Sequence, residues 1–596
     1  MPHTFHIPVL GLGFSIDTPL KVARYGISSV ASIVDDELIE RMRQYHTSQN
    51  NMEYLPINSH EPDSRARRIS AYLNLMHDLV NQQFDKLKNQ PFEPGNDITR
   101  YFDLLPDTSA LKQDYLRMMA CANLHEQEMM KYHLRWRMQQ GATDVNIMAK
   151  VDKLNYNSDD EFLGDENTDA LAALRGFAMS KLQSSVIMSA GMNPKLYSYI
   201  EHFDDFFPDA TGRLRKKVIL KVSDFRSALI QAKFLAKKGI WVSEFRIESG
   251  LNCGGHAFAT DGLLLGPILE EFKQKRQEML AELWAICQPV LEHKSYFAQT
   301  IPNQRISVQG GIGTGNENSF LLNYYQLDAT GWGSPFLLVP EATNVDDDTL
   351  TNLTTANTDD FYLSASSPLG VLFNNFKKSS IEQQRLNRIE HNRPGSPCTK
   401  KFLCNNTEFT EMAICTASRQ YQHLKIQELE AQQLPAADYQ QQYDAITEKI
   451  CLCEGLCASA YIKNDMLKPR ENNAVAICPG PNLAYFKSTY SLDQMAKHIY
   501  GGINLLQNVS RPNLFINELN LYIDYLKKDI AMHLKTLTDK KEKYFSKFKE
   551  QLQQGIDYYK QLIPQITNET QESIQDMYRL LSLSEAELNL ILVVKE

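Results

Sequence analysis

The chain has 596 residues, of which 43% are hydrophobic and 22% are charged, and its formal net charge is −10 at pH 7. This ordinary apolar fraction excludes wholesale disorder and collagen-like folds, and the acidic balance argues against nucleic acid as a partner. The sequence has no run of about 18 apolar residues and no basic-then-apolar leader, and its ten cysteines are too sparse for a disulfide scaffold, so we expect a cytoplasmic protein without a membrane partner.

Short, mostly β-branched runs alternate with amphipathic stretches through the first 340 residues. The eight runs are Ile7–Leu10, Ile27–Val34, Asp144–Ala149, Ser185–Ser189, Lys217–Val222, Ser243–Glu248, Arg305–Val308 and Asp328–Trp332. Several of them have a continuous apolar centre, which is typical of strands buried on both faces. Eight strands are the number that closes a parallel α/β barrel, so we predict a (β/α)8 TIM barrel. The same alternation also permits an open, doubly wound sheet.

Two regions depart from this alternation. A largely helical stretch at about 62–142 separates the second and third predicted strands, and we expect it to be an insertion over one end of a barrel that spans 1–342. The rest divides into a cysteine-containing extension of mixed helix and loop at 343–512 and a C-terminal helical segment at 513–596. The helices of that last segment have one apolar face, which usually indicates packing on the protein's own core.

Glycine-rich turns follow the last three predicted strands, at the end of the barrel where ligands bind. They lie at Glu248–His256, Gln309–Gly315 and Gly331–Ser334. Successive glycines allow backbone N–H groups to approach an anion closely, and a helix N-terminus behind them adds a favourable dipole. One such turn alone is more often a plain tight turn, but three in this order favour a phosphate site after strands seven and eight.

These turns resemble those of the nitronate monooxygenase (2-nitropropane dioxygenase-like) family, whose members are FMN-containing TIM barrels. The motifs that carry the resemblance are Gly250…Gly254-Gly255-His256, Gly310-Gly311-Ile312-Gly313, Ala329…Gly333-Ser334…Phe336, Ile7–Gly11 with Thr18-Pro19-Leu20, and Val145-Asn146-Ile147. The resemblance covers roughly residues 6–342. It implies an FMN-dependent oxidoreductase that acts on a small organic or acyl substrate, with NAD(P)H or O2 as the second reactant.

The resemblance also implies roles for individual residues. The cofactor-binding set would be Asn146, Ser249, Gly250, Gly254, Gly255, Gly310, Gly311, Gly313, Gly333 and Ser334, of which the last four would hold the phosphate. Lys221, at the end of the fifth strand, would place a cation near the flavin ring, where it stabilises negative charge on the reduced form. His256 is the acid/base candidate. The alternatives are a structural lysine and a histidine that only hydrogen-bonds the phosphate or backbone; Lys150 has the same ambiguity as Lys221.

The sequence departs from the family pattern after the fourth strand, where Met188–Pro194 contains no histidine to act as a base. Ser249 replaces a glutamine and Asn252 a glutamate. These differences argue against nitronate oxidation more than against flavin binding. One alternative is an enoyl-reductase-like flavoprotein of the same superfamily, because hydride transfer to a double bond does not need that base. Another is a non-catalytic barrel scaffold that assembles, as a homo-oligomer for example, through its C-terminal helices.

Six of the ten cysteines are concentrated in the extension: Cys398, Cys404, Cys415, Cys451, Cys453 and Cys457. Thiolates gathered in one region suit an iron–sulfur cluster or zinc. Their spacing matches neither zinc nor ferredoxin patterns, however, and buried free cysteines commonly serve as small hydrophobic residues. A metal centre and ordinary packing are therefore both open interpretations of these residues.

Overall fold

Eight parallel strands close into a barrel in the order of the sequence. The computed structural model describes residues 2–148, 152–156, 161–189, 191–257, 261–533 and 538–591. The barrel strands are β1 (Phe5–Ile7), β2 (Ser28–Ser32), β3 (Thr143–Asn146), β4 (Ser185–Met188), β5 (Lys217–Val222), β6 (Val242–Glu248), β7 (Arg305–Gln309) and β8 (Ala329–Gly331). Pairing of β1 with β8 completes the closure and confirms the predicted (β/α)8 barrel over the open sheet.

The first strand begins and ends earlier than predicted. It covers Phe5–Ile7 instead of Ile7–Leu10, and Pro8, which lacks the N–H that a ladder bond needs, follows directly. The polar run of β6 also has a structural explanation. Arg246 forms ion pairs with Glu244 at 2.8 Å and with Asp144 of β3 at 3.6 Å, so these alternate residues of β6 face the barrel interior.

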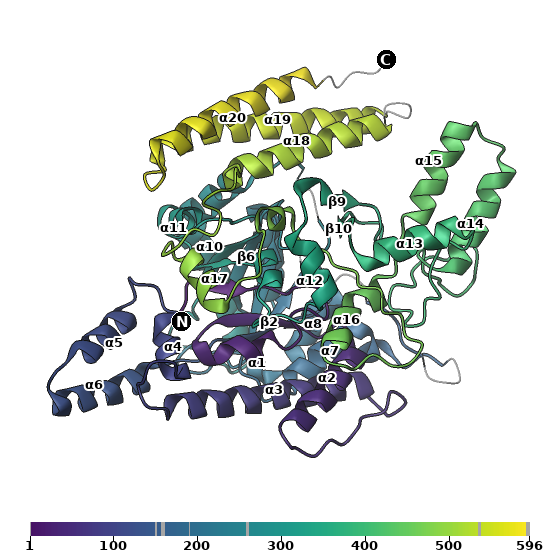
Figure 1. Cartoon of the computed structure of the whole chain (residues 1–596). Helices are drawn as coiled ribbons and strands as arrows, with labels where there is room; N and C mark the ends of the chain where they lie inside the picture. Colours follow the sequence, from purple (N-terminus) through teal and green to yellow (C-terminus); the bar gives the residue numbers. More distant parts are fainter. Residues whose placement is uncertain are drawn as a thin grey trace.

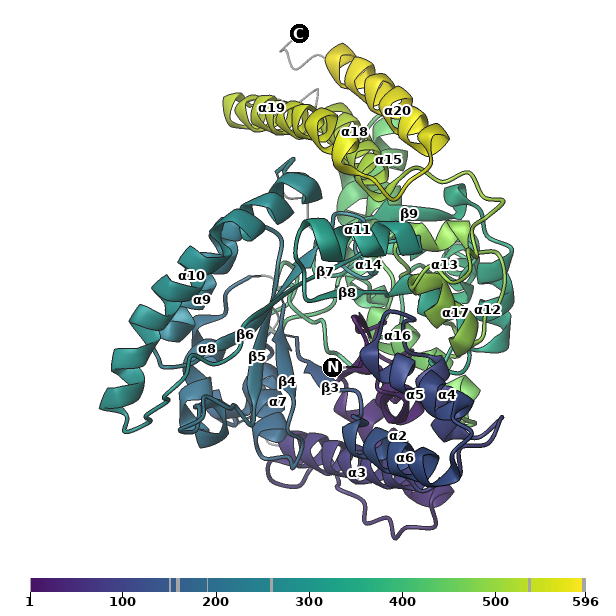
Figure 2. The ribbon, with the colours of Figure 1, turned by 90° about the vertical axis from the view of Figure 1, so that its left-hand side faces the viewer.

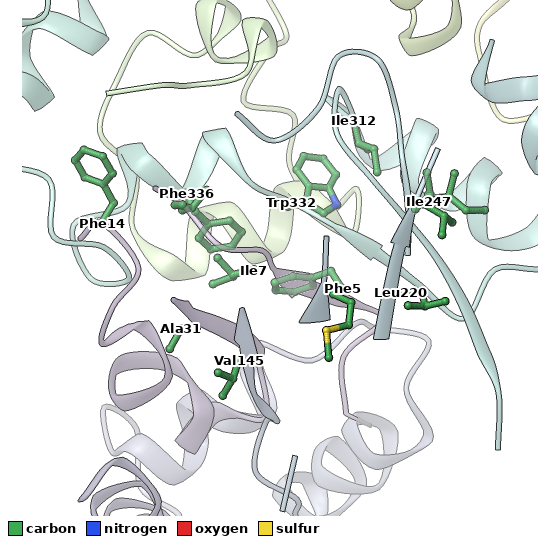
Figure 3. Packing of buried hydrophobic residues seen from close by; sticks show 14 of the residues in the cluster. Phe5, Ile7, Phe14, Ala31, Val145, Leu220, Ile247, Ile312, Trp332 and Phe336 are labelled. Carbon is green, nitrogen blue, oxygen red and sulfur yellow. The ribbon is translucent and has the colours of Figure 1, made fainter. Parts of the chain in front are cut away.

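The barrel interior combines this charged strip with a small apolar cluster of Val30, Ile187 and Ile219. The larger core lies outside the strands, beneath the helices, and Figure 3 shows Val145 and Ile247 among its members. The helices associated with the barrel are α1 (Thr18–Val22), α2 (Asp36–Gln49), α7 (Asp169–Ala178), α8 (Pro194–Tyr199), α9 (Phe225–Ala236), α10 (Leu265–His293) and α11 (Gly315–Tyr324). Figure 2 shows α9 and α10 on the outer side of β5 and β6.

The stretch between β2 and β3 is helical, with α3 (Ser64–Lys88), α4 (Asp97–Asp103), α5 (Ala110–Ala120) and α6 (Leu124–Arg137). α3 packs against α2 and α7 in the helical layer around the barrel. Its Tyr72 hydroxyl donates a 3.0 Å hydrogen bond to the carbonyl of Ile16. α5 and α6 pack against each other and lie at the edge of the molecule (Figure 1).

The extension after the barrel contains a two-stranded antiparallel sheet and several short helices. Its elements are α12 (Asp347–Thr354), β9 (Phe361–Ser364), β10 (Phe373–Phe376), α13 (Ser380–Glu390), α14 (Arg419–Ala431), α15 (Ala436–Thr447), α16 (Leu452–Lys463) and α17 (Leu492–Ile499). The helices α14 and α15 form a hairpin that projects to one side in Figure 1.

Three long helices end the described chain: α18 (Leu514–His533), α19 (Asp539–Leu562) and α20 (Gln571–Leu590). They pack against one another, and α18 and α19 also pack against α10 of the barrel. Figures 1 and 2 show them above the barrel, and their buried apolar side chains belong to the same hydrophobic core as those of the barrel. No helix within the described ranges is both long and apolar enough to cross a bilayer.

Candidate functional site

A cavity of about 460 Å³ lies at the C-terminal ends of the barrel strands, a volume typical of cofactor and small-molecule pockets. The barrel side of the cavity is formed by residues at or after the ends of β1 to β6: Val9–Leu12, Ser32, Val34, Asn146, Ser189, Lys221 and Glu248. The opposite wall comes from the extension and is mostly apolar: Leu369, Val371, Phe373, Asn405, Leu456, Ile477 and Cys478. The cavity is thus enclosed between the barrel and the extension, at the face where barrels of this type carry active sites.

The structure brings five of the sequence-predicted residues into this cavity: Asn146, Lys221, Gly254, Gly255 and His256. They come from the ends of β3 and β5 and from the turn after β6. The other predicted residues do not line it: Ser249, Gly250, Gly310, Gly311, Gly313, Gly333 and Ser334. Lys150 lies outside the described residues.

Lys221 does not stand alone in the cavity. Its Nζ lies 3.0 Å from Oε2 of Glu248 at the end of β6, and Oε1 of Glu248 accepts a 2.8 Å hydrogen bond from Nε2 of Gln309. Sequence reasoning missed Glu248 and Gln309. The signal for Glu248 was the alternation of Glu244, Arg246 and Glu248, which places its side chain on the same face of β6 as Arg246.

The turn after β6 is held by the extension. Gly254 and Gly255 adopt positive φ angles of 120° and 80°, which favour glycine, and a Cβ on Gly254 would lie 2.2 Å from the carbonyl oxygen of Cys478. The N–H of Gly255 donates to that same carbonyl at 3.0 Å. Beside this turn, Nε2 of His256 and Oγ of Ser367 share a 2.7 Å hydrogen bond. The extension therefore orients the imidazole at the cavity wall.

Ser249 and Gly250 bind a carboxylate from the chain itself. The hydroxyl of Ser249 and the N–H of Gly250 donate to Oε1 of Glu518 in α18 at 2.8 and 2.7 Å. The N–H of Leu265, the first residue of α10, donates to Oε2 at 2.7 Å. Burial raises the pKa of Glu518. Both residues assigned to the flavin by resemblance thus contact α18 instead of the cavity.

The glycine loop after β7 is also filled by the chain. The N–H of Gly313 donates to Oε2 of Glu317 at 2.8 Å, and Oε1 of Glu317 accepts from the N–H of Leu514 at 2.6 Å and from Arg511 at 2.7 Å. Arg511 also donates to the carbonyl of Gly311 at 2.6 Å. The side chains of Arg511 and Glu317 are each only 4% exposed, so this ion pair is a buried part of the loop.

The turn after β8 is packed in the same way. The hydroxyl of Ser334 donates to the carbonyl of Cys253 at 2.9 Å and accepts from the N–H of Gly480 at 2.7 Å. A Cβ on Gly333 would lie 2.5 Å from the Cβ of Cys253. Burial raises the pKa of the Cys253 thiol, so the thiolate form is disfavoured there.

These contacts divide the predicted FMN site into two parts. The ring end fits, because the cavity combines apolar walls with a few polar groups, including Asn146 and Lys221. The phosphate end does not fit at the glycine loops as they stand, because Gly313 and Ser334 already bond to groups of the chain and neither is among the residues that line the cavity. The assignment of phosphate to these loops stays a prediction that the geometry does not favour.

The cysteine-rich part of the extension is not assembled as a metal centre. Within the described residues, no group of three or more His, Cys, Asp or Glu side chains could hold a metal ion. The sulfur atoms of Cys398 and Cys404 lie 4.0 Å apart, and the thiol of Cys457 donates to Asp35 at 3.1 Å. The other members of the predicted ligand set, Cys415, Cys451 and Cys453, are buried in the hydrophobic core. Within the described residues these cysteines are packed as thiols, which is one of the two interpretations that the sequence left open, and an iron–sulfur or zinc site is not shown.

No family model and no curated protein sequence matches the chain. Solved structures similar to it include FabK from Thermotoga maritima, with 12% identity, a TM-score of 0.30 and coverage of 69% of this chain and 86% of that one. The enoyl reductase domain of MlnA from the macrolactin biosynthesis cluster of Bacillus amyloliquefaciens has 15% identity, a TM-score of 0.32 and coverage of 68% and 89%. A nitroalkane oxidase from Streptomyces ansochromogenes has 10% identity, a TM-score of 0.32 and coverage of 84% and 94%. Similarity at this level does not assign an activity to the chain.

Proposed function

We propose that the chain is a flavin-dependent oxidoreductase and that the flavin ring binds in the cavity between the barrel and the extension. The observation that carries this proposal is convergence. Asn146 and Lys221 lie at the ends of β3 and β5 and the turn Gly254–His256 follows β6, yet all of them line one cavity. The sequence motifs that resemble the nitronate monooxygenase family assign these same positions to the flavin or to the reaction.

A bound flavin supplies hydride and electron transfer, and the protein supplies position and charge. Lys221 would hold a positive charge beside a bound ring, while Glu248 and Gln309 fix the position of its ammonium. The amide of Asn146 offers both a donor and an acceptor to a heteroaromatic ring edge. His256, oriented by Ser367, is the group that would hold or release a proton during turnover.

Within this class we favour hydride transfer to or from a small organic or acyl substrate over nitronate oxidation. Ser189 follows β4 and lines the cavity where the family resemblance would place a basic histidine. A serine hydroxyl is a much weaker base than an imidazole, so proton abstraction from a nitroalkane lacks its expected residue. An enoyl-reductase-like reaction, with NAD(P)H as the electron donor, does not need that base.

The test is reconstitution of the purified chain with flavin, followed by its visible spectrum. We expect the two bands of a protein-bound oxidised flavin; a colourless protein that takes up no flavin would overturn the proposal. Lys221→Met is expected to lower the reduction potential of the bound flavin, because it removes positive charge near the ring. Lys195→Met, in an exposed lysine of α8 that pairs with Asp165, is the matched control and should leave the potential unchanged.

A further inference from the structure

We infer that the cavity selects a flavin whose side chain ends without a phosphate, such as riboflavin, in preference to FMN. This inference rests on the proposed function and deepens it, since it concerns which flavin the same site takes. The sequence of the glycine loops predicts a phosphate site, but the contacts that these loops make in the structure do not favour one.

The loop after β7 already contains an anion of the chain. Glu317 accepts hydrogen bonds from the N–H of Gly313 at 2.8 Å and from the N–H of Leu514 at 2.6 Å. Backbone N–H groups of this kind are the donors that a phosphate would need. The cation of the loop is Arg511, and its N–H donors are already bonded. It pairs with Glu317 and donates to Gly311 and, at 2.8 Å, to Asn482. A phosphate placed here would lie beside a buried carboxylate and would be repelled by it.

The turn after β8 leaves no room for an anion either. The Ser334 hydroxyl is used both as donor and as acceptor, and Gly480 lies against it. A single added Cβ on Gly480 would lie 2.4 Å from the carbonyl oxygen of Asn252 and 3.2 Å from Oγ of Ser334. A segment packed this closely cannot admit a phosphate group without moving away from the barrel.

The charges of the cavity lead to the same conclusion. Among its described lining residues, the only Lys, Arg, Asp or Glu side chains are Lys221 and Glu248, and they form one ion pair at 3.0 Å. A phosphate brings close to two negative charges at neutral pH, and burying it without a matching cation is costly. Hydroxyl groups of a neutral side chain can instead bond to Ser32, Asn146 and Asn405 in the wall.

The experiment titrates flavin-free protein with riboflavin, FMN and lumiflavin, the ring without a side chain, and follows quenching of flavin fluorescence. We expect riboflavin to bind roughly tenfold or more tightly than FMN, because the phosphate loses its hydration without gaining charged partners. FMN binding that equals or exceeds riboflavin binding would overturn this inference and leave the proposed function intact. Absence of binding by all three flavins would overturn the proposed function as well.

Glu317→Gln tests the cause of the selectivity. The substitution keeps the side-chain shape, removes the carboxylate charge and leaves Arg511 as an uncompensated cation in the loop, so the affinity for FMN relative to riboflavin should rise several-fold. Glu408→Gln, in an exposed pair with Lys425, is the matched control and should leave the ratio unchanged. Because each ratio is measured within one protein, a loss of folded material affects both flavins equally. An unchanged ratio in Glu317→Gln would refute the role of this carboxylate.

Discussion

The buried pair of Arg511 and Glu317 provides a direct test of how the C-terminal helices are attached to the barrel. Arg511→Met keeps an unbranched side chain but removes the bonds to Glu317, Gly311 and Asn482. Glu317 would then be a buried carboxylate with two backbone N–H donors and no cation. Removing one partner of a buried ion pair typically costs about 3–5 kcal/mol. We expect most of this loss at the start of α18, where Leu514 is bonded to the same carboxylate.

Hydrogen exchange of α18 amides, followed by mass spectrometry, measures this local effect. A loss of about 3–5 kcal/mol in local opening free energy corresponds to exchange that is roughly 10²- to 10⁴-fold faster. The matched control is Lys527→Met in the same helix, where lysine and its partner Glu587 are 42% and 44% exposed. Such surface pairs contribute about 0–1 kcal/mol, so this variant should exchange almost like the natural chain.

A double variant distinguishes loss of the pair from loss of packing. Arg511→Met combined with Glu317→Gln leaves no buried charge unpaired, so its effect should be smaller than the sum of the two single effects by about 1–3 kcal/mol. Unchanged exchange in Arg511→Met would show that the pair does not hold α18 on the barrel. Strictly additive effects would show that the two side chains act independently, against the geometry.

Three further predictions concern the barrel interior, the cysteines and the segment at Gly480. Burial opposes ionisation of Glu244, but Arg246 and Arg305 outweigh it and lower its pKa to about 2. A lowered pKa stabilises the fold at pH values above the ordinary glutamate range, so Glu244→Gln should lower the free energy of unfolding by about 3 kcal/mol at pH 7. As the pH drops from 4.5 towards 2, the thermal midpoint of this variant should fall less than that of the natural chain. We expect the purified chain to lack stoichiometric iron and acid-labile sulfide; their presence, with absorbance beyond the flavin bands, would contradict the thiol packing seen around Cys457. Gly480→Ala should lower the thermal midpoint and weaken flavin binding, whereas Gly502→Ala, whose Cβ would lie 3.5 Å from its nearest neighbour, should do neither.

The barrel could be predicted because its signal is local. Each strand is a short run whose burial is visible in its own residues, and the chain order of the runs is also their order in the barrel. The ends of the strands were harder to predict where one residue decides them, as Pro8 does after β1. The alternating charges of β6 weakened the strand signal there, because the interior of this barrel contains ion pairs where apolar side chains are more usual.

The candidate site was only partly predictable. Asn146, Lys221 and the turn at Gly254 are recognisable from the residues beside them, and they do meet in one cavity. Ser367, Glu518 and Arg511 are not recognisable, because each acts on a loop more than 100 residues away and has no local pattern that marks its partner. A glycine-rich turn indicates backbone freedom and close approach, but its sequence does not state whether a phosphate or the chain's own carboxylate approaches it.

The long separation between the barrel loops and their partners affects how the protein is made. Gly250 and Glu518, which share a hydrogen bond, are 268 residues apart in the sequence. At translation rates of about 5–20 residues per second, this interval lasts on the order of tens of seconds. During that time the strands can pair on the ribosome while the loops after β6 and β7 lack the groups that bond to them. The loops at the ligand-binding end of the barrel therefore gain these bonds only after the last third of the chain has been synthesised.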